Sequence, residues 1–305
     1  MRGINERDEM KVQTLSLRDS GHVGQLAFEQ MEALWPETPK KSIKPQLDPA
    51  VCWWCGGKGD AREHRIKRTD VIREFGPGID RDTLHINRAR VEEQRRGPNA
   101  GEMKFRTPLC VNCNSARSQR FDYAEVAFTN YYRAHEEEIV RTKILNLAGV
   151  FPLDLQRQAE DLRRYFVKHA ACVINDLGFD VSQNVRSYLD GTNPLTDIAM
   201  SPHVCESMFD IMAGLPAGTP GPVGYDDASS LRDPKTGLVY EISGNWVYRS
   251  LHIHWAFRWM RTVPTANPFS GNISLPVDPR PVLPVFFGSV PPKKPAAVKR
   301  PRAES

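Results

Sequence analysis

Two Cys-x2-Cys pairs are the clearest metal-binding pattern among the residues of this sequence that could do chemistry. They supply four thiols, from Cys52, Cys55, Cys110 and Cys113. Four thiolates are the ligand set of a closed, tetrahedral structural zinc site, so the pairs predict bound zinc. Fifty-four residues separate Cys55 from Cys110, more than in a compact zinc ribbon. We therefore expect a hairpin or a small subdomain between the two pairs.

Three polar residues close to these pairs are not needed by a structural zinc site. Glu63 and His64 lie between the pairs, and Asn114 directly follows the second pair. Histidine has an ordinary pKa of ~6.5, so His64 can act as a general base near neutral pH. Glu63 and Asn114 offer the oxygen ligands that Mg²⁺ prefers. A base and a metal ion are what phosphodiester hydrolysis requires, because water must be deprotonated and the leaving oxygen stabilised.

Positive charge is concentrated around the cysteine pairs. The whole chain carries a net charge of +4, but Cys52 to Arg120 holds 15 Lys/Arg against 9 Asp/Glu. Such an excess favours contacts with phosphates, although a solvated charged surface has the same composition. The residues that we expect to contact nucleic acid are Arg65, Lys67, Arg68, Arg106, Arg117 and Arg120.

At these positions the sequence resembles the HNH endonuclease superfamily, also called His-Me finger or ββα-metal nucleases. The matching stretches are Cys52-Trp-Trp-Cys55, Glu63-His-Arg-Ile-Lys67 and Leu109-Cys-Val-Asn-Cys-Asn114, within roughly residues 50–123. The resemblance implies a DNA endonuclease in which the four cysteines hold structural zinc and His64 is the general base. It implies that Glu63 and Asn114 hold a catalytic Mg²⁺ or Mn²⁺.

Two further residues could support such a site. The segment before the second cysteine pair, from Lys104 to Leu109, lacks the middle asparagine of the family pattern, and Asn87 on the preceding strand is the substitute that the sequence offers. Asp122 follows the second pair within Arg117-Ser-Gln-Arg-Phe-Asp122, and we expect it to orient the site or to contact the metal.

The elements that must position these residues predict an α+β fold. Alternation over 84–87 and the run 104–109 predict strands, and a helix is expected to begin near Ser115. Three-and-four spacing of apolar residues predicts helices across 121–189, and His203 to Met212 favours one more. The runs 238–243 and 246–257 predict a hairpin that turns at Gly244-Asn245. Cys172 and Cys205 stand alone and are expected to be buried.

Four segments follow from these patterns. We predict a helix and proline-rich linker over 1–50, the zinc nuclease module over 51–123, a helical region ending in a hairpin over 124–262, and a basic disordered tail over 263–305. The tail contains ten of the 24 prolines. The role of 124–262 is open: it could bind a second copy of the chain or a partner from a defence or mobile-element system.

The composition restricts the function classes. The chain has no run of 18 apolar residues, so it is not expected to span a membrane. Met1 to Lys11 is charged and has no apolar secretory core, so we expect a cytoplasmic protein.

The preferred hypothesis is a DNA endonuclease, with RNA not excluded as substrate. A zinc-stabilised protein that binds nucleic acid without cutting it is the alternative. An interaction protein with zinc only as scaffold is a third class.

Overall fold

The computed structural model describes nine segments of the chain. These are residues 50–76, 84–88, 91–95, 103–106, 108–194, 196–225, 228–232, 239–258 and 267–277, and for 84–88 and 91–95 it describes the backbone only. The predicted lead segment up to residue 49 lies outside the described residues, and so does the predicted tail except for residues 267–277. This stretch was predicted to be disordered, but it forms a short strand at Asn272–Ser274 and buries Phe269 and Leu275.

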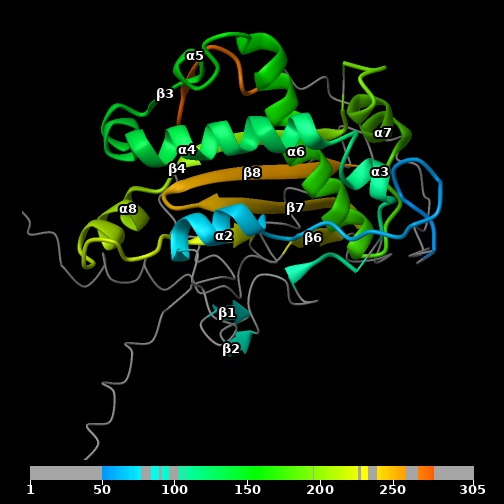
Figure 1. Ribbon diagram of the computed structural model, residues 1–305, viewed down its shortest axis with the longest axis horizontal. Helices are drawn as coiled ribbons and strands as arrows, with labels where there is room; N and C mark the ends of the chain where they lie inside the picture. The colour runs from blue at the N-terminus through cyan, green and yellow to red at the C-terminus, as the bar shows by residue number, and fades with distance from the viewer. Residues whose placement is uncertain are drawn as a thin grey trace, which may run out of the picture.

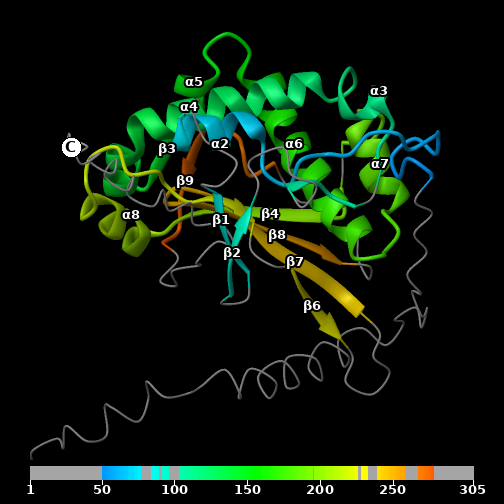
Figure 2. The ribbon, with the colours of Figure 1, turned by 60° about the horizontal axis from the view of Figure 1, so that its bottom comes forward.

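Two long helices, α4 and α6, cross one face of the main sheet (Figure 1). The helices are α2 (Arg68–Phe75), α3 (Val111–Asn114), α4 (Gln119–Thr142), α5 (Leu147–Val150), α6 (Leu155–Asp176), α7 (Gln183–Leu189) and α8 (Glu206–Ala213). No helix in these described segments combines the length and the apolar composition that a membrane span requires. Figure 2 shows α2, α4 and α6 on the same side of the sheet.

The main sheet is antiparallel and has the order β4-β8-β7-β5, with β6 also paired to β7. Its strands are β4 (Ile198–Val204), β5 (Val223–Tyr225), β6 (Ser229–Arg232), β7 (Val239–Tyr248) and β8 (Leu251–Arg258). Two small antiparallel pairs lie apart from it: β1 (Leu84–Arg88) with β2 (Val91–Arg95), and β3 (Ile144–Asn146) with β9 (Asn272–Ser274). The expected combination of helices and antiparallel strands is confirmed, and so is the strand over 84–87.

Aromatic side chains join the helices to the sheet. Phe166 of α6 contacts Trp246 of β7 edge-to-face, with ring centroids 5.0 Å apart. Tyr132 of α4 meets Tyr248 in the same way at 6.4 Å. These residues belong to one continuous buried cluster that extends from Cys52 to Leu275. The segment 51–123, called the cysteine module from here on, therefore shares a core with the helical region 124–262. The predicted boundary at residue 123 falls inside α4.

The predicted turn at Gly244-Asn245 is wrong. Strand β7 continues through both residues, which pair with Trp255 and His254 of β8. The chain reverses instead at Arg249-Ser250, where Arg249 adopts a left-handed φ of 55°. This conformation is unusual for arginine, and the carboxylates of Glu74 on α2 and Glu136 on α4 hold the side chain in place. Gly-Asn is a good turn sequence, but tertiary contacts decide the register here.

Three other predicted elements differ in their bounds. The helix expected near Ser115 is two helices, because α3 ends at Asn114 and α4 begins at Gln119. The run 104–109 is not a regular strand: it makes isolated bridges, His64 with Lys104 and Ala61 with Leu109. The segment from His203 is split, since β4 extends to Val204 and α8 begins only at Glu206. The helices that we expected across 121–189 are confirmed as α4, α6 and α7.

Candidate metal centre

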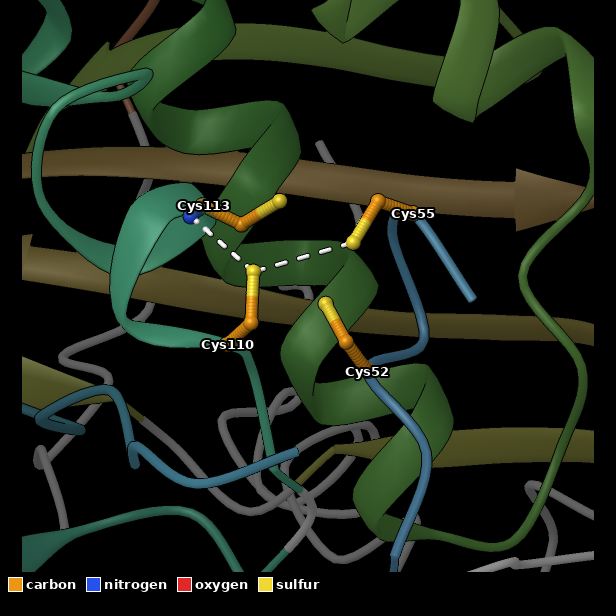
Figure 3. A group of neighbouring side chains, drawn as sticks. All are labelled: Cys52, Cys55, Cys110 and Cys113. Atoms are coloured by element: carbon orange, nitrogen blue, oxygen red, sulfur yellow. Dashed lines mark hydrogen bonds between the residues drawn. The ribbon is translucent and has the colours of Figure 1, made fainter. Parts of the chain in front are cut away.

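The four cysteine side chains converge at one point (Figure 3). Their sulfur atoms all lie within 4.8 Å of one another, and Cys55 Sγ is 3.6 Å from Cys110 Sγ. An ion at ~2.3 Å from four tetrahedral sulfurs requires them to be ~3.8 Å apart, so the donor set fits zinc. Within the described segments, this is the one group of three or more His, Cys, Asp or Glu residues whose ligand atoms converge in this way.

The first pair lies in a tight hairpin, held by a bridge between Val51 and Lys58. The amide of Cys52 donates to the carbonyl of Gly57 at 2.7 Å, and the amide of Gly56 donates to the carbonyl of Cys52 at 2.9 Å. Gly56 has a φ of +75°, which a side chain would disfavour. The turn therefore aims both thiols of the pair at the same point.

The second pair begins a helix. Cys110 is the N-cap of α3, and its sulfur accepts a hydrogen bond from the amide of Cys113 at 3.3 Å. The bridge between Ala61 and Leu109 brings this turn beside the first, across the long connection. The Asp60 carboxylate also accepts from the amide of Val111 at 3.0 Å. Backbone bonds thus place the two pairs together.

A cation from the turn between α3 and α4, and an aromatic ring from the first hairpin, support the cluster. The Arg117 guanidinium donates to Cys113 Sγ at 3.2 Å and lies over the Trp54 ring, 4.6 Å from its centroid. The indole of Trp54 donates to Asp190 at 2.7 Å, and Asp190 also pairs with Arg117. Burial raises the pKa of the Cys113 thiol, and Arg117 opposes this effect. A bound metal cation would favour the thiolate further.

Glu63 turns inward and pairs with an ammonium group. Its carboxylate contacts Nζ of Lys168, and Nε2 of His169 lies 3.9 Å from its other oxygen. Burial favours the neutral acid, but Lys168 and His169 outweigh that effect and lower the pKa of Glu63. Lys168 is only 1% exposed and also donates to Ser118 Oγ at 3.0 Å. Glu63 is therefore an ionised carboxylate with an internal counter-ion.

His64 points elsewhere, because side chains alternate along an extended segment. The residue is half-buried, and its Nε2 is buried without a hydrogen-bond partner among the residues that the structure describes. Burial lowers the pKa of His64, and the charges of Lys104 and Arg68 lower it further, whereas Glu63 opposes the shift. The imidazole is thus neutral near pH 7, with a free nitrogen lone pair or N–H at Nε2.

Asn114 lies at the end of α3, beside the segment that carries His64. Its Nδ2 donates weakly to the carbonyl of Arg62 at 3.5 Å, and its Oδ1 is buried with no partner in the described segments.

The two residues predicted to support the site lie elsewhere. Asn87 lies on β1 opposite Glu92, and its side chain is outside the described residues. Asp122 forms an ion pair with Lys67 at 3.3 Å.

Five of the six basic residues that we expect to contact nucleic acid are paired with acidic side chains of this chain. The pairs are Arg65–Asp176, Lys67–Glu125, Arg106–Asp176, Arg117–Asp190 and Arg120–Asp161. Arg106 and Arg120 remain largely exposed, at 76% and 51%. Arg68 is exposed and forms no ion pair with another described residue. The cationic groups available to a phosphate are therefore fewer than the sequence count indicates.

Four residues that pair with the predicted site residues come from α6 and from the end of α7, and they were not predicted from the sequence. They are Lys168, His169, Asp176 and Asp190. A signal does exist for the first two, because Lys168 and His169 interrupt the otherwise apolar stretch from Tyr165 to Cys172. Charged residues on a buried helix face require partners, which predicts contacts with an acidic residue elsewhere.

Comparison with known proteins adds no assignment. No family model matches the chain, and searches of the curated proteins and of the solved structures give no significant match.

Proposed function

We propose that this protein is a zinc-stabilised, HNH-type endonuclease that hydrolyses phosphodiester bonds of DNA, with His64 as the general base. The observation that carries the proposal is the buried Nε2 of His64, which has no hydrogen-bond partner among the described residues and lies in the sequence between the two cysteine pairs, where the resemblance predicts a base. Buried polar atoms in folded proteins nearly always have a partner, so an exception requires an explanation, and catalysis is the one that the resemblance offers for His64.

The proposed reaction uses groups of this chain. Water attacks phosphorus and forms the new P–O bond while its proton moves to Nε2 of His64. The bond to the leaving oxygen breaks, the alkoxide takes a proton from solvent, and the imidazolium later returns its proton to solvent. Lys104 and Arg68 act on His64 electrostatically and would attract the phosphate. Asn114 Oδ1 is a second buried acceptor with no partner among the described residues.

The resemblance also predicts a catalytic Mg²⁺ held by Glu63 and Asn114. The residues present do not fit that ion in this arrangement, because the Glu63 carboxylate is already paired with Lys168. The cysteine cluster fits zinc, and zinc in a site closed by four thiolates supplies folding energy rather than an activated water. No step above is therefore routed through a metal ion.

Substitution of His64 tests the proposal. We expect His64→Ala to lower the rate of DNA cleavage by roughly 10²–10⁴-fold, the usual contribution of a general base, while DNA binding persists. Cleavage of a labelled duplex and fluorescence anisotropy measure the two quantities. Because the pKa of His64 is lowered, the wild-type rate should fall to half its maximum on the acid side at a pH below ~6.5, the ordinary pKa of histidine. His64→Ala should lack this acid limb.

A matched control is His203→Ala. His203 is also half-buried, but it lies on β4, and its Nδ1 bonds to the carbonyl of Ser201 at 2.9 Å. Its loss should leave cleavage within about twofold of wild type. DNA binding without cleavage under all metal and substrate conditions would instead support the non-catalytic alternative. Absence of both binding and cleavage would favour the interaction-protein class.

A further inference from the structure

Lys168 and Glu63 form a buried ion pair beside the proposed base. The ammonium comes from the middle of α6, and the carboxylate comes from the residue directly before His64, 105 positions earlier in the sequence. Lys168 is 1% exposed, and the Glu63 side chain is 13% exposed. Ser118 at the start of α4 accepts a second hydrogen bond from the same ammonium at 3.0 Å. Three elements thus fix one positive charge on this carboxylate.

The surroundings of Glu63 are unfavourable for a divalent ion. Mg²⁺ requires nearly octahedral oxygen ligands and usually keeps several water molecules. One carboxylate oxygen contacts Lys168, and Nε2 of His169 lies 3.9 Å from the other oxygen and 3.3 Å from the carbonyl of His64. The ammonium has no lone pair to offer a metal ion, and its charge repels a cation. Within the described segments, no other acidic, histidine or cysteine ligand atoms converge here.

We propose that Lys168 is an internal counter-cation that replaces a divalent metal ion at Glu63, so that phosphodiester cleavage by this chain requires no Mg²⁺ or Mn²⁺. Lys168 is a positioning residue: it holds Glu63, and through the backbone it holds His64, without contacting the substrate. The statement about cleavage rests on the proposed function. The statement about metal binding does not, and it can be tested on protein without any activity.

The first test is a Mn²⁺ titration of the zinc-loaded, full-length protein, with free Mn²⁺ followed by electron paramagnetic resonance. We expect wild type and Glu63→Gln to bind the same amount of Mn²⁺, because no ion is held at Glu63. If wild type binds about one equivalent that Glu63→Gln loses, the proposal is overturned.

A second variant assigns the effect to the ammonium group. Lys168→Met removes the charge, keeps similar volume and leaves the Glu63 carboxylate and the Ser118 hydroxyl without that partner. We expect this variant to gain Mn²⁺ binding that Lys168→Met/Glu63→Gln lacks. If Lys168→Met folds and binds no more Mn²⁺ than wild type, burial rather than Lys168 excludes the ion, and the assigned role is wrong. The wild-type titration decides the metal question even if this variant does not fold.

The last arm measures cleavage with and without chelator, and zinc content is checked in the same samples. Wild-type activity should change by less than about twofold when Mg²⁺ is replaced by EDTA, provided that zinc is retained. A loss above tenfold that Mg²⁺ restores would overturn metal independence while leaving the endonuclease proposal intact. Absence of cleavage under every condition contradicts the endonuclease proposal, and the Mn²⁺ titration still decides the role of Lys168.

Discussion

Cys110→Ser is expected to lose zinc and to unfold the cysteine module. Its sulfur approaches Cys55 Sγ at 3.6 Å and accepts the amide of Cys113, so it is both a ligand and a helix cap. Structural zinc contributes ~10–16 kcal/mol in isolated zinc-finger peptides, which is comparable with the whole stability of a typical domain, ~5–15 kcal/mol. Metal analysis of the purified protein and thermal unfolding by circular dichroism would measure both effects.

Cys205→Ser is the matched control for this change. Cys205 is fully buried, as Cys52 and Cys113 of the four-thiol cluster are, but it lies between β4 and α8 and outside that cluster. This variant should retain one zinc per chain, whatever its effect on melting. Full zinc content together with an unchanged melting curve in Cys110→Ser would contradict a four-thiolate site.

Glu74→Ala is expected to destabilise the folded protein strongly. Glu74 lies in the last turn of α2 and is 1% exposed on its side chain. Its carboxylate accepts hydrogen bonds from the Tyr248 hydroxyl at 2.9 Å, the Arg249 guanidinium at 3.0 Å and the amide of Gly221 at 3.1 Å. Removal deprives the Tyr248 hydroxyl and the Gly221 amide of this acceptor and leaves Arg249 paired with Glu136 alone. We expect a cost of up to ~3–5 kcal/mol, the range for a buried ion pair that loses one partner. Urea unfolding would measure the change in free energy.

Two comparisons make this second prediction specific. Glu137→Ala removes an exposed carboxylate from α4 and should change the unfolding free energy by less than about 0.5 kcal/mol. The Arg249→Ala single variant and the double variant with Glu74→Ala complete a cycle in which the two losses should be strongly non-additive. A Glu74→Ala cost below ~1 kcal/mol, or simple additivity, would show that this network does not fix the β7–β8 turn.

The metal cluster could be predicted from the sequence because the information is local. Each Cys-x2-Cys spacing forms a turn that aims two thiols at one point, and the chemistry of four thiolates selects the ion. Helices α4 and α6 were predictable for a similar reason, since the three-and-four spacing of apolar residues is a local property of one face. Cys172 and Cys205 were expected to be buried, and both are fully buried.

The partners of the charged residues could not be predicted in this way. Glu63 pairs with Lys168 and Arg65 pairs with Asp176, and in each case more than 100 residues separate the two. No local pattern specifies which buried carboxylate a lysine will meet, because that depends on how α6 packs against the cysteine module. The same dependence moved the hairpin turn from Gly244-Asn245 to Arg249-Ser250, where Glu74 and Glu136 bind the arginine.

The candidate site is therefore divided between two kinds of residue. The four cysteines can supply a complete ligand set for zinc, and His64 carries the proposed chemistry with a nitrogen that has no partner among the described residues. We propose that an ion bound by the cysteines is structural and has no open position for water or substrate. Glu63, which the sequence offers as a metal ligand, is held by Lys168 and lies outside that ligand set.

X-ray absorption at the zinc edge tests this claim most directly, because it reports the ligands of the bound ion in solution. We predict a first shell of four sulfur atoms at ~2.3 Å with no nitrogen or oxygen ligand. A shell that requires a nitrogen or oxygen atom in place of a sulfur would show an open or mixed site, and would contradict the assignment of a purely structural zinc.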